Sequence, residues 1–336
     1  IVARAAWQLG RVLKQKGEIK QAIAAYDKAF ESLQSLRNDL VAINREIQFE
    51  FRESVEPIYR EFASLLLNEG TPPLGKGGQG GIEQANLAKA RKVLEALQLA
   101  ELDNFFGDAC IKTKPVEIDQ IDQQAAVIYP IILSDRLEVI LSIPNQPLRH
   151  YATRLPRQQI ETTLENFYSA IFPAYSRNQR QQISKQVYDW LIQPAVADLT
   201  SNNIKTLVFV PDGLFRNIPM AALYDGKEYL IEKYSVAISP GLQLFPEPLE
   251  SKQFTVLAAA LTEARQGFIA LPAVAREIQQ ISAKVEAQVL LNQQFTRASF
   301  QTAIEGKSFP VLHLATHGQF SSNPDETFLL TWEDTI

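Results

Sequence analysis

The chain has 336 residues, of which 46% are hydrophobic and 21% are charged. This composition is typical of a soluble globular protein, and the length favours two or three domains, each with its own apolar core. The net charge of -5, with acidic and basic residues interspersed, indicates neither nucleic acid nor an anionic membrane as a partner. We therefore expect protein partners.

Two further features concern the compartment. The longest apolar runs, such as residues 125–128 and 130–133, are far shorter than the roughly 20 residues that a membrane helix needs. Cys110 is the single cysteine, so no internal disulfide is expected and the cytoplasm is the predicted location. The sequence begins at Ile1 without a secretory signal, which predicts that the chain was excised from a longer protein.

The first helical pair has the residue spacing of a tetratricopeptide repeat of about 34 residues. Its small residues would let two helices approach closely, its larger ones would fill the seam, and Gly17 would mark the turn. The matching positions are Leu9, Gly10, Leu13, Ala22, Tyr26 and Ala29.

The repeat pattern is incomplete, because Ala6 stands at an aromatic position, with Trp7 beside it, and Gln34 replaces the closing proline. An ordinary helical hairpin is therefore the alternative. About three repeats are needed for a stable array, so we expect further repeats upstream of Ile1. Residues 40–68 continue in helical period and resemble a degenerate last repeat.

A linker and a connecting helix follow. Residues 71–81, TPPLGKGGQGG, have a linker composition; they are not a phosphate loop, because Lys76 is not followed by Ser or Thr and no strand precedes it. Residues 83–106 then return to a helical pattern, with apolar positions at Ala88, Val93, Leu94, Leu97 and Leu99.

From Ala125 the pattern changes to strands. Residues 125–133 and 137–144 flank a turn-like Ser-Asp-Arg triplet and predict a hairpin. Later strands and helices alternate, which predicts a mainly parallel sheet with helices on its faces, and sites in such sheets lie at the carboxyl ends of strands. The expected helices are 159–172, 181–198, 273–285 and 297–304, and the expected strands are 205–210, 256–261, 288–291 and 311–316.

The last of these strands, in VLHLATHGQF, delivers His317 and Gly318 to a loop. A histidine can accept a proton from a thiol and return it to a leaving amine. Gly318 has no side chain, so a substrate carbonyl could approach its backbone N–H as in an oxyanion hole. The two residues are half of a catalytic site.

At this point the sequence resembles the bacterial CHAT family, which is caspase-like and associated with tetratricopeptide repeats. The resemblance rests on residues 211–245 (PDGLFRNIPMAALYDGKEYLIEKYSVAISPGLQLF), 270–281 (ALPAVAREIQQI) and 313–320 (HLATHGQF), with weaker similarity at 101–110. It implies a caspase-like α/β fold behind an all-α repeat region. Its implied domains are 1–68 (tetratricopeptide-like), 69–120 (linker and connecting helix), 121–250 (pseudo-caspase part) and 251–336 (catalytic part).

The resemblance also implies an activity. His317 matches the catalytic histidine of the family and Gly318 its oxyanion glycine. The implied reaction is attack of a thiolate on a peptide bond, with no cofactor or metal and with a protein regulator bound to the helical repeats. In the caspase spacing the cysteine follows the His-Gly pair by about 50 residues, so we expect it beyond Ile336 and expect this part alone to be inactive.

Several alternatives remain open. The whole protein is either a cysteine endopeptidase or a catalytically silent interaction scaffold. Cys110 would be the nucleophile only if the chain were complete. His313 lies about 13 Å from His317 along an extended strand, too far to share a metal ion, and is expected to be a hydrogen-bonded core residue.

Two loops have weaker claims to function. The segment 211–213, Pro-Asp-Gly, is interpreted as a tight turn after a buried strand. Glu263 follows another strand and is a weak candidate for lining the substrate pocket, with an exposed carboxylate as the simpler interpretation.

Overall fold

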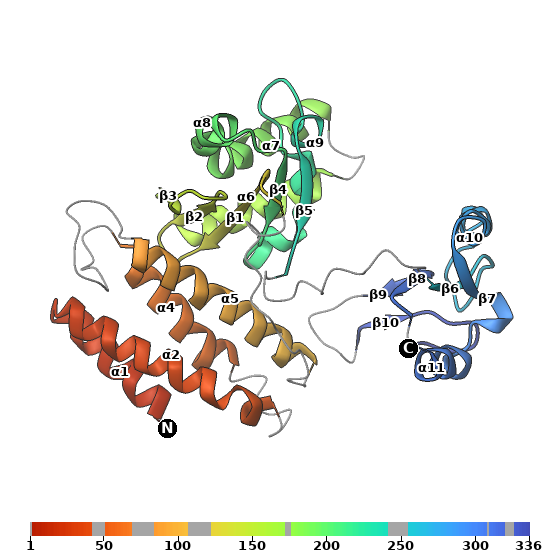
Figure 1. Ribbon diagram of the computed structural model, residues 1–336, viewed down its shortest axis with the longest axis horizontal. Coiled ribbons are helices and arrows are strands. Elements are labelled where there is room, and N and C mark those ends of the chain that lie inside the picture. The colour runs from red at the N-terminus through yellow and green to blue at the C-terminus, as the bar shows by residue number, and fades with distance from the viewer. Residues whose placement is uncertain are drawn as a thin grey trace. The chain divides into compact units, whose positions relative to one another are not determined.

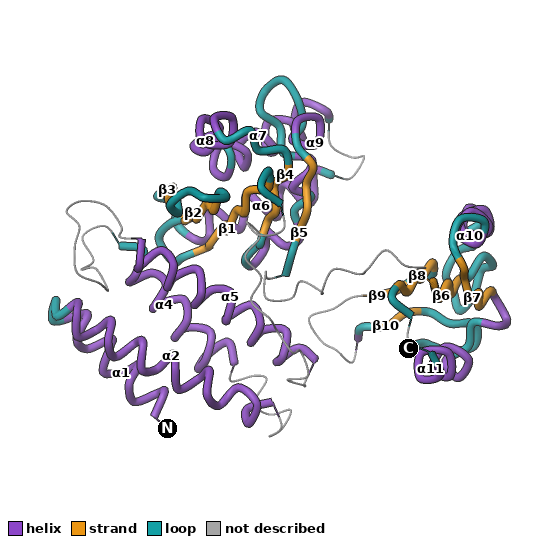
Figure 2. Tube along the Cα trace, in the orientation of Figure 1, coloured by secondary structure: helices purple, strands orange, loops and turns teal. Residues whose placement is uncertain are grey.

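The chain forms two compact units, Ile1–Phe245 and Pro246–Ile336. The computed structural model (Figure 1) describes residues 2–41, 51–68, 84–106, 122–171, 176–240, 255–307, 309–319 and 326–336. Helices, strands and loops along this trace are distinguished in Figure 2. None of the helices in these ranges has the length and apolarity needed to cross a membrane. The domain boundaries at 68, 120 and 250 stay predictions.

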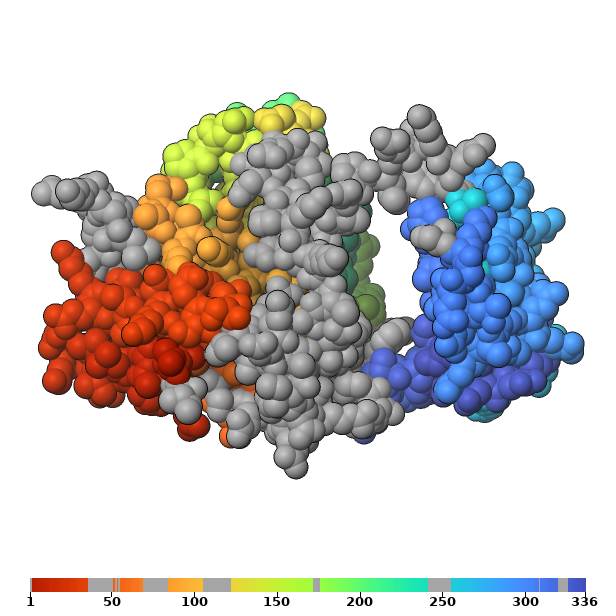
Figure 3. Space-filling model, turned by 60° about the horizontal axis from the view of Figure 1, so that its bottom comes forward, coloured from red at the N-terminus to blue at the C-terminus, as the bar shows by residue number. Residues whose placement is uncertain are grey.

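The first unit begins with a helical hairpin, α1 (Val2–Gln15) and α2 (Ile19–Val41), coloured red in Figures 1 and 3. The close approach predicted at Gly10 is confirmed, since a Cβ atom there would lie 2.8 Å from Tyr26 Cδ2. Gly17 has a φ of 78°, which explains a glycine at the turn. The seam prediction for Leu9 is wrong: its side chain is 54% exposed, because buried Trp7 fills the seam instead.

The rest of the helical region covers one face of a sheet. A short π-helix, Phe51–Val55, leads into α4 (Glu56–Leu66), and α5 (Gln84–Phe106) packs beside α4. The predicted apolar positions of α5 are buried except for Ala88, which is exposed. One continuous apolar core joins side chains of these helices to Val127, Tyr129 and Val208 of the sheet. The helix predicted as a connector is therefore a structural layer.

The sheet of this unit has five strands in the order β3-β2-β1-β4-β5. The predicted hairpin is present, since β1 and β2 are antiparallel, and β2 and β3 are antiparallel as well. Strand β4 is parallel to β1 and β5, so the sheet is mixed and the prediction of a mainly parallel sheet does not describe it. The bounds are β1 Ala125–Ile132, β2 Leu137–Ser142, β3 Arg149–Thr153, β4 Thr206–Phe209 and β5 Ser235–Ile238.

Helices cover the opposite face of the sheet. All eight residues of β1 are buried. Alternate side chains pack against the helical region on one face and in a second core on the other. That second core contains Phe167, Trp190, Phe209 and Phe215. The helices on this side are α6 Arg157–Ala170, α7 Arg177–Leu191, α8 Val196–Ser201 and α9 Leu230–Lys233.

A buried ion pair joins the helical region to the sheet. Arg60 of α4 donates through Nη1 and Nη2 to the two carboxylate oxygens of Asp212, at 2.8 and 3.0 Å, and the Ile132 N–H also donates to Asp212. Burial by itself raises the pKa of the Asp212 carboxyl, but the charge and hydrogen bonds of Arg60 outweigh it and hold the pKa below its usual range. Glu101 of α5 pairs with Arg216 beside this site.

A second polar cluster lies near helix α4. Glu138 of β2 is 1% exposed and lies between Arg136 and His150, both of which contact its carboxylate. Arg136 also donates to the main-chain oxygen of Ser64 in α4, at 3.2 Å. Helix α4 is therefore attached to the sheet at two polar points, one at Asp212 and one at Arg136.

The second unit has three parallel strands in the order β7-β6-β8. Alternate residues of β6 face opposite sides: Ala258 and Ala260 pack against α10, while Ala259 packs with Phe295, Leu330 and neighbouring apolar residues. The bounds are β6 Thr255–Ala260, α10 Ala273–Ser282, β7 Glu286–Leu291, α11 Arg297–Gly306, β8 Val311–Ala315, β9 Gly318–Gln319 and β10 Phe328–Leu329. The strands and helices predicted here are confirmed, with ends that differ by a few residues.

Because Asp212 is buried and paired with Arg60, removal of the Arg60 guanidinium should cause a large loss of stability. The change Arg60→Met leaves a buried carboxylate without its counter-charge and should lower the free energy of unfolding by about 3 to 5 kcal/mol. Chemical denaturation measures this change. The matched control is Lys185→Met, which breaks an exposed pair with Asp189 and should cost less than about 1 kcal/mol. Equal losses in the two variants would contradict the assigned role of Asp212.

The lowered pKa of Asp212 predicts a pH dependence. Its ionised form stabilises the folded protein above the ordinary value of 3.8, and this contribution is lost as the pH falls below that value toward the folded pKa. Asp212→Asn should therefore be less stable than the parent at about pH 6, and the difference should shrink toward about pH 3. Denaturation curves across this range test it, and a constant difference would contradict it.

Candidate functional site

The predicted catalytic pair lies at the carboxyl end of a parallel strand. Strand β8 ends at Ala315, Thr316 and His317 follow, and β9 begins at Gly318. The main-chain oxygen of His317 accepts a hydrogen bond from the Leu330 N–H, at 2.8 Å, and the Thr316 hydroxyl donates to the Leu330 oxygen, at 2.7 Å. The half-buried histidine is therefore held on its main-chain side by the segment around β10.

The loop between β6 and α10 orients the His317 ring. The ring stacks on Phe268, with centroids 5.0 Å apart, and Nε2 lies 2.8 Å from the main-chain oxygen of Ile269. A carbonyl oxygen only accepts, so Nε2 must carry the proton and donate it. In the neutral ring the lone pair is then on Nδ1, which makes Nδ1 the atom able to accept a proton.

A tight turn shapes this loop. Arg265 and Phe268 exchange two main-chain hydrogen bonds, at 2.7 and 3.2 Å, around Gln266 and Gly267. These central residues have φ values of 49° and 86°, as a type I′ turn requires. Residues 265–269 were not among the predicted site residues. The Gln-Gly pair was the available signal, and it indicates a turn without showing that the turn reaches His317.

Gly318 has a main-chain N–H that does not bond to the neighbouring strand. Gly318 lies opposite Leu329 in the antiparallel β9–β10 pair. Leu330 N–H donates to His317 O and Leu329 N–H donates to Ile336 O, so Gly318 and Leu329 form a non-hydrogen-bonded pair. The Gly318 N–H therefore points away from β10, and the residue is exposed.

The structure separates the other candidate residues from this pair. The Nε2 atom of His313 is 3.2 Å from Glu277 Oε1 but lacks hydrogen-bond geometry, and the side chain is 29% exposed, so the expectation of a hydrogen-bonded core residue is wrong. Glu263 accepts from Asn292 Nδ2 at 3.3 Å and is exposed. Cys110 lies outside the described residues. Within the described ranges, no three His, Cys, Asp or Glu side chains gather as metal ligands would.

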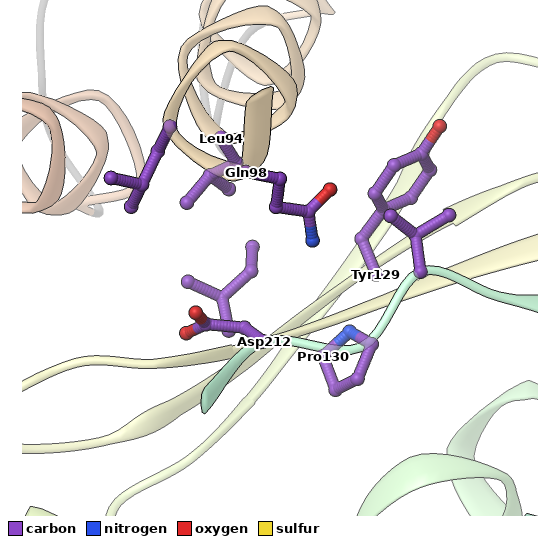
Figure 4. Close-up of a pocket in the computed structure, with 8 residues that line it drawn as sticks. Leu94, Gln98, Tyr129, Pro130 and Asp212 are labelled. Carbon is purple, nitrogen blue, oxygen red and sulfur yellow. The ribbon is translucent and has the colours of Figure 1, made fainter. Parts of the chain in front are cut away.

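The Pro-Asp-Gly segment has a larger structural role than a simple turn. Besides pairing with Arg60, its Asp212 lines a small, mostly apolar cavity between α5 and the sheet (Figure 4). Gln98 of α5 projects toward this cavity and donates to the Pro211 oxygen at 3.3 Å. The cavity contains none of the predicted catalytic residues, and we assign it to the contact between helix and sheet.

Comparison with known proteins supports the family resemblance over part of the chain. Residues 181–335 match the family model of the CHAT domain, from within α7 to the end of the second unit. The matched region is a little less than half of the chain and includes His317 and Gly318. This region is therefore similar to a caspase-like, peptidase-related domain.

Other comparisons contribute little. A solved structure titled "PilM-PilN type IV pilus biogenesis complex" matches 50% of this chain and 54% of its own chain, at 13% identity and a TM-score of 0.19. The match thus spans about half the length of that relative, and its TM-score supports no inference about fold or function. A search among curated proteins found no match.

The geometry of His317 predicts its tautomer. The neutral ring should carry its proton on Nε2, because that atom donates to the Ile269 oxygen. Nitrogen NMR of ¹⁵N-histidine protein with a neutral His317 ring would show a protonated Nε2 and an unprotonated Nδ1. His317→Gln assigns the signal, and the opposite tautomer would contradict the hydrogen bond.

Proposed function

We propose that the full-length protein is a cysteine endopeptidase of the CHAT type that acts in the cytoplasm. The observation that supports this most is the arrangement of His317: it lies at the carboxyl end of β8, within the region that matches the CHAT domain, and Ile269 accepts its Nε2–H. A histidine oriented on one nitrogen has the other available for proton transfer.

The proposed roles follow from the two residues at the strand end. Nδ1 of His317 accepts the proton of a cysteine thiol and then returns it to the leaving amine. The thiolate attacks the peptide carbonyl to form an acyl-enzyme, which water hydrolyses. The Gly318 N–H, directed away from β10, donates a hydrogen bond to the carbonyl oxygen as negative charge develops there.

The nucleophile is proposed to lie in the protein beyond Ile336, because no residue of this chain matches it. The sequence that follows Ile336 in the encoding gene tests this directly. A cysteine after a short apolar strand would support the endopeptidase, and the lack of one would favour the alternative function, a catalytically silent scaffold.

The helical region is proposed to be a tetratricopeptide-type array that binds a protein regulator. Supporting this, the outer face of α1 presents Val2, Leu9 and Val12, which are 57, 54 and 48% exposed. Their spacing of seven and three residues places them on one helix face, where a further helix or a protein partner would bury them.

The endopeptidase and the scaffold differ in their response to loss of His317. In the full-length protein, His317→Ala should reduce cleavage by a factor of about 10² to 10⁴, because no other described group occupies the position of the general base. The measurement is the rate at which the parent and the variant cleave each member of a panel of candidate substrate proteins. If the scaffold interpretation is correct, the parent and the variant will be equally inactive and will bind partners equally.

A control separates catalysis from folding. His313→Ala changes the histidine within strand β8, which the proposed mechanism does not use, and should leave the cleavage rate within about twofold. Both variants should keep the unfolding midpoint of the parent within a few degrees. Equal loss of cleavage in the two variants would contradict the assignment of His317 as the base.

A further inference from the structure

We propose that Asn292 is a positioning residue for His317: it fixes the base of the loop between β6 and α10, and this loop orients the histidine ring. The inference deepens the proposed function and rests on it, because the orientation of His317 affects catalysis only in a peptidase. All of the residues involved belong to the second unit.

Asn292 lies directly after strand β7, next to the end of β6. The two strands are parallel, with Ala260 opposite Leu291, so the residues that follow them emerge at the same edge of the sheet. Thr262 follows β6 at this edge, and His317 follows β8 on the other side of β6. The neighbouring strand ends thus bring Asn292 to the start of the loop that reaches the histidine.

The Asn292 amide binds Thr262 at two points. Its Oδ1 accepts from the Thr262 main-chain N–H, at 2.8 Å, and its Nδ2 donates to the Thr262 hydroxyl oxygen, also at 2.8 Å. The main-chain oxygen of Thr262 accepts from the Leu271 N–H, at 3.0 Å, which closes the loop. The N–H, hydroxyl and carbonyl of Thr262 are therefore all bonded, and this residue is the fixed base of loop 263–270.

The part of the loop that contacts the histidine is close to this base. Ile269, whose main-chain oxygen accepts the Nε2–H of His317 at 2.8 Å, precedes Leu271 by two residues. Phe268, which stacks on the ring, is held in the tight turn by its main-chain bonds to Arg265. A displaced base would move the accepting oxygen relative to the ring, and a hydrogen bond weakens steeply as its distance and angle change.

Asn292 also supports the main-chain side of the histidine. Its own main-chain oxygen accepts from the Phe295 N–H, at 2.8 Å, and the Phe295 oxygen accepts from the Trp332 N–H, at 2.8 Å. Two residues before Trp332, the Leu330 N–H donates to the His317 oxygen, at 2.8 Å. Hydrogen bonds that start at Asn292 therefore lead both to the ring of His317 and to its main chain.

The backbone of Asn292 explains why an asparagine is suited to this position. Its φ of 51° is in the left-handed region, which glycine and asparagine adopt more readily than other residues. Glycine would fit the backbone but has no amide. Aspartate would accept from Thr262 but lacks the donor, and its charge would lie beside the Glu263 carboxylate, which accepts from Nδ2 at 3.3 Å. Asparagine meets the backbone and the side-chain requirement together.

The test compares variants of the full-length protein by two separate measurements, cleavage kinetics and nitrogen NMR of the histidine. Asn292→Gly keeps the backbone conformation and removes the amide. It should lower kcat by about 10- to 100-fold with little change in KM, because a misplaced base slows the chemical step while the substrate-binding surface stays. The Nε2 and Nδ1 signals of its neutral His317 ring should move toward each other as the second tautomer becomes populated.

Further variants separate positioning from folding. Thr262→Val removes only the hydroxyl partner and should show both effects to a smaller extent, whereas Thr262→Ser restores the hydroxyl and should recover most of kcat. If Asn292→Gly does not fold, Thr262→Val decides. Asn203→Gly removes the amide of an exposed asparagine of the first unit with a φ of 52°, and should keep the kcat and the histidine signals of the parent. An equal loss of kcat in Asn203→Gly would overturn the proposal.

The two measurements also separate this proposal from the proposed function. If the parent cleaves, an unchanged kcat or unchanged histidine signals in Asn292→Gly would overturn the role of Asn292 and leave the endopeptidase in place. A raised KM with the kcat of the parent would likewise overturn it, because Asn292 would then act on substrate binding. A parent that does not cleave would count against the endopeptidase, and the histidine signals alone would decide whether Asn292 positions the ring.

Discussion

Burial of strand β1 on both faces is the constraint on which the first unit depends. Its eight residues are all buried, so neither face of the sheet around it can be exposed to solvent. Helices α6 and α7 cover one face, and α4 and α5 cover the other. The Arg60–Asp212 pair adds direction to this apolar contact, because a bidentate ion pair forms in one relative position of helix α4 and the loop that follows β4.

In this arrangement, side chains of the helical region are part of the same apolar core as side chains of the sheet. A partner that binds α1 or α2 would contact a layer whose later helices, α4 and α5, pack directly on the sheet. Arg60 of α4 and Gln98 of α5 bond to the loop that follows β4. Arg136, in the turn between β1 and β2, bonds to the main chain of α4. These contacts join the helical region to the sheet of the first unit.

In the second unit, the same requirement to cover both sheet faces shapes the candidate site. Packing of Leu330 and Phe295 on Ala259 brings the segment after β9 back over the sheet, and Leu330 then bonds to the main chain of His317. The β6–α10 loop approaches from the neighbouring strand and provides Phe268 and Ile269. The histidine is thus oriented by residues about 50 positions before it and about 13 after it in the chain.

The sequence by itself determined the longer helices and the buried strands, the β1–β2 hairpin and the position of His317 after a strand, because these depend on local periodicity and on turn residues. It did not predict the short strands β3 and β5, and the helix expected at 181–198 is divided between α7 and α8. It did not determine that Leu9 faces solvent, that Asp212 pairs with Arg60, or that Ile269 and Phe268 orient the histidine. Those contacts join residues far apart in the chain, and only the tertiary structure decided them, because packing of whole elements selects which side chains meet.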